Sequence, residues 1–135
     1  MIILGPKLPP LTQGVALVLI GANEDVREAL TNAIADFADL SVTTLEGGET
    51  RGIYGYGEAL ALEADILVVD GYPKTGLMRN KLQEIITSHY VVVQQANGHA
   101  RTVKCPKYVI IWTNTWDMMA MGDKYYRCYR LGGAL

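Results

Sequence analysis

Three short runs of apolar residues constrain the fold of this chain more than any other feature of its sequence. VALVLI begins at Val15, ILVV at Ile66 and YVIIW at Tyr108, and each run is rich in β-branched residues. Unbroken apolar runs of this length are typical of strands that are covered on both faces. The sequence therefore predicts an α/β protein in which a parallel sheet is buried between helices.

Amphipathic segments lie between these runs. Asn23 can cap a helix that extends to Leu40, and acidic residues in its first turn suit the helix dipole. The apolar residues at helical spacing in this segment are Val26, Leu30, Ala33, Ile34 and Phe37. A second helical segment shows the same spacing at Met78, Leu82, Ile85 and Ile86. The segment SVTTLE is predicted to form a further strand, and Glu58–Glu63 is predicted to form a short helical piece. Strands and helices therefore alternate along the chain.

Each of the three apolar runs ends in a glycine or a polar residue. Gly21, Asp70 and Asn114 follow or end the predicted strands. Because ligands of such sheets bind at the carboxyl ends of the strands, we expect these residues to converge on one edge.

A β-hairpin is predicted between the second helix and the last apolar run. HYVVVQQ and ARTVK are strand-like, and the Asn97-Gly98 pair between them is a strong hairpin signal. His99, Arg101 and Lys104 are expected at its tip, with Lys107 just beyond.

Charge is divided unevenly along the chain. Residues 1–97 carry six Lys or Arg and twelve Asp or Glu, a net charge of −6, whereas residues 98–135 carry six Lys or Arg and two Asp, a net charge of +4. A polyanion is therefore expected to meet the C-terminal third.

Length and composition limit the class of protein. The 135 residues suffice for one domain, which we place at residues 15–135 after an extended, Pro-rich lead-in at 1–14.

No apolar run approaches the roughly 20 residues of a membrane span, and the first residues lack the pattern of a signal peptide. We expect an intracellular protein that is not secreted and does not enter a membrane. Cys105 and Cys128 are expected to be reduced thiols.

The order of these motifs resembles the second half of a superfamily 3 helicase domain, as found in replication-associated (Rep) proteins of small circular single-stranded DNA viruses, nanovirus- and circovirus-like ones especially. In that family a strand ends in a Walker B acid, a hairpin with Gly and Lys follows, a strand ends in Ser/Thr-Asn, and an arginine-bearing segment comes last. The corresponding stretches here are LVVDGYP, NGHARTVK, VIIWTN and YYRCYR. The resemblance covers residues 60–131 well and the first 60 residues loosely.

The resemblance implies a three-layer, P-loop-NTPase-like (AAA+-like) parallel sheet with an inserted β-hairpin. It implies catalytic roles for Asp70, which would also hold the magnesium of Mg-ATP, and for Asn114, which would orient the attacking water. Arg127 and Arg130 would stabilise charge on the phosphoryl group across a subunit boundary, which implies a homo-oligomer.

For the hairpin, the resemblance implies contact with single-stranded nucleic acid. His99, Arg101, Lys104 and Lys107 would contact phosphates through charge, without reading bases. A viral protein of this kind would act in the cytoplasm or nucleus of its host.

The chain departs from the family at the phosphate-binding loop, whose pattern is G-x-x-x-x-G-K-[ST]. GANEDVRE stands in its place: Gly21 matches, but Val26 and Arg27 replace the second glycine and the lysine, and Glu28 replaces the magnesium-binding hydroxyl. Carboxylates at a helix N-terminus occupy its amides and repel a triphosphate. We therefore expect nucleotide binding at Gly21 and Arg27 to be weak or absent, and hydrolysis to be weakened or lost.

Two alternatives remain. VLIGANEDVREAL and GEALALEADILVVD resemble a response-regulator receiver domain, in which Glu24 and Asp25 would bind magnesium and Asp70 would be phosphorylated. However, Thr113 lies 43 residues beyond Asp70, where a receiver has its Thr or Ser after about 30. The other alternative is a structural module that self-associates through the tyrosine- and methionine-rich tail.

Overall fold

The computed structural model describes residues 11–21, 23–46, 57, 59–71, 73, 76–94, 98–114 and 124–130. Five parallel strands in these ranges form one sheet with the spatial order β2-β3-β6-β1-β7. Their bounds are β1 Ala16–Ile20, β2 Val42–Glu46, β3 Ile66–Asp70, β6 Tyr108–Thr113 and β7 Tyr126–Arg130. The predicted α/β class with a buried parallel sheet is confirmed.

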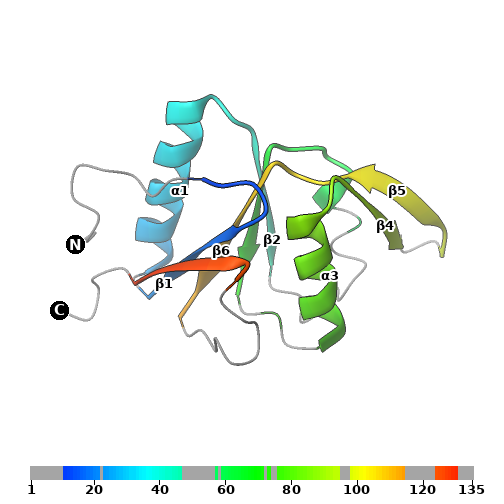
Figure 1. The fold of residues 1–135 in the computed structure, drawn as a ribbon. Helices are drawn as coiled ribbons and strands as arrows, with labels where there is room; N and C mark the ends of the chain where they lie inside the picture. Colours follow the sequence, from blue (N-terminus) through cyan, green and yellow to red (C-terminus); the bar gives the residue numbers. More distant parts are fainter. Residues whose placement is uncertain are drawn as a thin grey trace.

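Helices cover both faces of the sheet, with α1 (Glu24–Ala38) on one face and α3 (Gly76–Thr87) on the other (Figure 1). The predicted hairpin is also present, as the antiparallel pair β4 (Tyr90–Gln94) and β5 (Ala100–Lys104). It stands beside α3, away from α1. Gly98 has a φ of 86°, which glycine adopts without strain at this turn.

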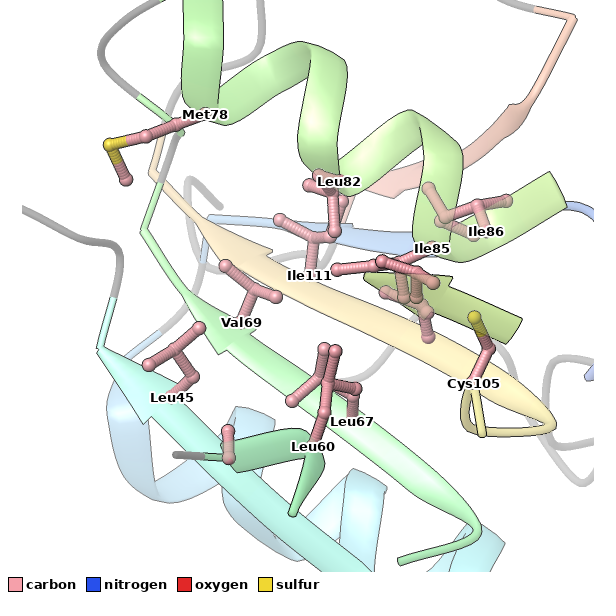
Figure 2. Packing of buried hydrophobic residues seen from close by; sticks show 14 of the residues in the cluster. Leu45, Leu60, Leu67, Val69, Met78, Leu82, Ile85, Ile86, Cys105 and Ile111 are labelled. Carbon is pink, nitrogen blue, oxygen red and sulfur yellow. The ribbon is translucent and has the colours of Figure 1, made fainter. Parts of the chain in front are cut away.

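The α3 face of the sheet holds the larger part of the core. Leu82 and Ile85 are fully buried and point from α3 onto β3 and β6, where Val69 and Ile111 lie (Figure 2). Burial of Met78, Leu82, Ile85 and Ile86 confirms the predicted apolar face of this helix.

On the opposite face, Leu30 and Ile34 of α1 pack onto the sheet. Asn23 caps the helix as predicted. The prediction that Ala33 belongs to the apolar face of α1 was wrong, because Ala33 is exposed. The buried face of the helix instead includes Arg27 and Thr31. Helical spacing places these two residues one turn from the buried leucine and isoleucine, so the helix covers them despite their polarity.

The strand order excludes the receiver alternative. In receivers and other flavodoxin-like sheets, the first strand lies between the second and the third. Here β1 lies between β6 and β7, and β2 pairs with β3. The magnesium and phosphorylation roles that the receiver resemblance implied for Glu24, Asp25 and Asp70 therefore have no basis in this fold.

One strand was not predicted. β7, with the sequence YRCYR, forms the edge of the sheet beside β1. Helical backbone at residues 57, 59 and 60 overlaps the start of the short helical piece predicted at Glu58–Glu63, but residues 61–62 form a turn, so the predicted end was wrong. The lead-in at 1–10, Asn97, Trp116 and most of the tyrosine- and methionine-rich tail lie outside the described residues. Within the described ranges, no helix has the length and apolar character needed to cross a bilayer.

Candidate functional site

The carboxyl edge of the sheet brings together three residues predicted to converge. Asp70 ends β3 in register with Trp112 of β6. The N–H of Gly21, just after β1, donates to the carbonyl of Thr113 at 2.9 Å. Asn114 follows Thr113 and is exposed. Gly21, Asp70 and Asn114 thus lie at the ends of three neighbouring strands, on the edge where this fold class binds its ligands.

The connection from β1 to α1 is too short to form a phosphate-binding loop. β1 ends at Ile20 and α1 begins at Glu24, so Val26 and Arg27 lie inside the helix and not in a loop before it. The N–H of Val26 donates to Oδ1 of Asn23 at 2.9 Å, and the N–H of Arg27 to the carbonyl of Asn23 at 3.2 Å. These two amides, which a P-loop would turn toward phosphate, are therefore engaged within the chain.

Arg27, at the position of the P-loop lysine, is buried between α1 and the sheet. Only 8% of it is exposed, and its guanidinium carbon lies 6.0 Å from the centre of the Trp112 ring. This is the geometry of a cation–π contact. Its Nε has no hydrogen-bond partner among the described residues. Arg27 is thus part of the core under α1, and its charge does not reach the surface at the carboxyl edge.

Thr31, on the same helix as Arg27, contacts the same tryptophan. Nε1 of Trp112 donates to the hydroxyl of Thr31 at 2.9 Å in the buried interior. This contact was not predicted, because a threonine in an amphipathic helix carries no signal of burial. The one indication in the sequence is that Thr31 lies four residues after Arg27, on the same helix face.

Replacing Thr31 with Val should lower the free energy of unfolding by about 1–3 kcal/mol, because the indole N–H of Trp112 would stay buried without a partner. Thr31→Ser keeps the hydroxyl and should cost clearly less. Urea unfolding of both variants measures the difference. Equal stability of the two variants would mean that the hydrogen bond contributes nothing.

Arg127 and Arg130 are both exposed on β7, but they lie at different levels of the sheet. Arg127 is in register with Leu17 and Arg130 with Ile20, so roughly 10 Å of strand separates them and they face opposite sides. Only Arg130 reaches the carboxyl edge. Two strands lie between β7 and β3, which places Arg130 roughly 14 Å from Asp70 across the sheet. Within one chain, the structure does not bring these arginines to Asp70.

The hairpin does not place its basic residues as predicted. Gln94 pairs with Ala100 next to the turn, whereas Tyr90 pairs with Lys104 at the opposite end. Exposed His99 and Arg101 therefore lie near the tip, but Lys104 lies at the base, one strand length away. The prediction that Lys104 sits at the tip was wrong, because β5 runs unbroken for five residues to that position.

Lys104 and Lys107 instead lie near the amino edge of the sheet, close to Asp65. The N–H and the hydroxyl of Ser41 donate to Asp65 at 3.0 and 3.1 Å. These hydrogen bonds lower the pKa of the Asp65 carboxyl, burial opposes them, and the charges of Lys107 and Lys104 lower it further. Asp65 directly precedes β3, so both lysines are a full strand length from Asp70.

Asp70 was also predicted to hold magnesium. Across the described residues, no group of three or more His, Cys, Asp or Glu is placed to hold a metal ion. The predicted roles of Asp70 and Asn114 in catalysis, and of Asp70 as a metal ligand, stay predictions.

No protein-family model matches the sequence, and no curated protein matches it. Solved structures do resemble the fold. The C-terminal region of NrS-1 (305–718) superposes with a TM-score of 0.65 at 14% identity, over 89% of this chain and 30% of that one. A protein of Cytophaga hutchinsonii classed as a candidate ATPase superposes with a TM-score of 0.60 at 12% identity, over 88% of this chain and 42% of that one.

These likenesses concern the fold. The fold is P-loop-like: a parallel sheet flanked by helices, with an antiparallel hairpin added. The chain spans less than half the length of these two structures.

Proposed function

We propose that this chain is a P-loop-fold subunit that binds single-stranded nucleic acid and has lost nucleotide hydrolysis. The observation that carries the proposal is the closed connection between β1 and α1. Asn23 caps the helix, and Arg27, at the lysine position, is buried against Trp112. A triphosphate at the P-loop position would find the amides of Val26 and Arg27 already hydrogen-bonded and the cation at the lysine position buried.

Exposed basic residues lie on the hairpin and toward the amino edge of the sheet. His99 and Arg101 near the hairpin tip, and Lys104 and Lys107 toward the amino edge, are exposed. Cations spread over an exposed surface suit a polyanion, whose phosphates they contact irrespective of base sequence. The Rep-like order of motifs supports a role in the replication of a small virus or plasmid, with the chain assembling as a homo-oligomer. Asp70, Asn114, Arg127 and Arg130 follow the family's order along the chain.

Binding of a labelled single-stranded oligonucleotide, followed by fluorescence anisotropy at several salt concentrations, tests the proposal. Affinity should fall steeply with salt, and Arg101→Ala with Lys104→Ala should weaken binding and reduce the salt slope by roughly 0.7 per lost phosphate contact. Lys124→Ala is the matched control, because Lys124 is also exposed but lies beside β7. The proposal fails if no salt-dependent binding occurs, or if the hairpin variants bind as tightly as the control.

A further inference from the structure

A groove at the amino edge of the sheet lies a full strand length from Asp70. Its volume is about 470 Å³, which falls in the range of small-ligand sites. It is formed by the end of α3, the segment between β5 and β6, and residues 13–14. Its polar lining consists of Gln13, Thr87, Ser88, His89, Lys104 and Lys107.

The charge of this groove suits an anion. His89, Lys104 and Lys107 are exposed, and the lining includes no carboxylate. Neither lysine has an ion-pair partner within the part of the chain that the structure describes. Asp65, whose pKa both lysines lower, already accepts two hydrogen bonds from Ser41. The Thr87 hydroxyl already donates to the carbonyl of Gln83 at 2.9 Å, so the donors that the groove offers a phosphate group are the two ammonium groups and the hydroxyl of Ser88.

An exposed tyrosine stands next to this groove. Tyr90 pairs directly with Lys104 across β4 and β5, so the two side chains share the outer face of the hairpin at a Cβ separation of roughly 5 Å. Tyr90 is 65% exposed, and Val92 on the same face is 53% exposed. An accessible aromatic ring beside a cation is the usual platform on which a nucleic-acid base stacks.

We propose that the groove binds the phosphate of a nucleotide against Lys104 and Lys107 while the base of that nucleotide stacks on Tyr90. The inference rests on the proposed function, since the nucleotide is taken as one unit of a bound single strand. A free mononucleotide offers the same chemistry, and the experiment separates the two sources.

The test compares a thymidine oligonucleotide, an abasic strand of the same length and thymidine monophosphate as probes. Tyr90→Ala should weaken binding of the oligonucleotide by roughly five- to 150-fold, the range for loss of one stacked base, whereas Tyr90→Phe should retain it. On the abasic strand Tyr90→Ala should have no effect. Lys107→Ala should weaken binding of both strands. Leu62→Ala is the control, because Leu62 is 70% exposed and does not line the groove.

The outcomes separate this inference from the proposed function. If the oligonucleotide binds and Arg101→Ala weakens it, but Tyr90→Ala matches Leu62→Ala, the inference is overturned and the proposed function stands. If only thymidine monophosphate binds, and both Tyr90→Ala and Lys107→Ala abolish this binding, the groove is a mononucleotide site and the proposed function fails. If no probe binds, both are overturned.

Discussion

Replacing Leu82 with Ala is expected to lower the free energy of unfolding by about 3–5 kcal/mol. Leu82 is completely buried at the centre of the face by which α3 packs on the sheet (Figure 2). Removing three carbon atoms there loses the transfer free energy of those atoms and leaves a cavity among side chains that β-strands hold in place. Urea unfolding followed by circular dichroism measures the change.

Leu77 supplies the control on the same helix. It is 63% exposed, so Leu77→Ala should change stability by no more than about 0.5 kcal/mol. Similar losses for Leu77→Ala and Leu82→Ala would contradict the packing of α3 described above.

Cys105 is expected to react with iodoacetamide at least roughly 100-fold more slowly than an unperturbed thiol, because only the thiolate is nucleophilic. Burial, followed by the nearby charge of Glu84, raises the pKa of the Cys105 thiol from 9.0 to about 11, and the side chain is only 7% exposed. A folded pKa above the unfolded one also means that the contribution of the neutral thiol to stability is complete below pH 9 and falls as the pH rises toward 11.

The rate for Cys105 is measured in a Cys128→Ser variant by mass spectrometry. The same variant in denaturant is the control, since unfolding restores the ordinary pKa. Equal rates in the folded and unfolded protein would contradict the burial of Cys105.

Much of the fold could be predicted, because continuous apolar runs define the central strands and a capped amphipathic pattern defines α1. β7 could not. In YRCYR, apolar and basic residues follow neither the alternation of a half-buried strand nor a continuous apolar run. Its edge position, with the arginines exposed and Tyr126 buried, permits this mixed pattern.

The candidate site was only partly predictable for a similar reason. Convergence of Gly21, Asp70 and Asn114 follows from the topology of a parallel sheet. The location of Arg27 does not follow from the topology. An arginine at the position of the P-loop lysine suggests a cation at the surface, whereas the structure buries Arg27 against Trp112. That contact depends on where α1 crosses the sheet, which local sequence does not determine.

We propose that a P-loop-like fold persists here without a working nucleotide site. Thermal unfolding with increasing Mg-ATP tests it most directly, because a ligand at 100 times its Kd stabilises the folded state by about 2.7 kcal/mol. We predict no saturable change in Tm up to millimolar Mg-ATP once Tyr90→Ala and Lys107→Ala have removed the groove at the amino edge as a second binding site. A saturable rise in Tm, accompanied by phosphate release that Asp70→Asn abolishes, would contradict the claim.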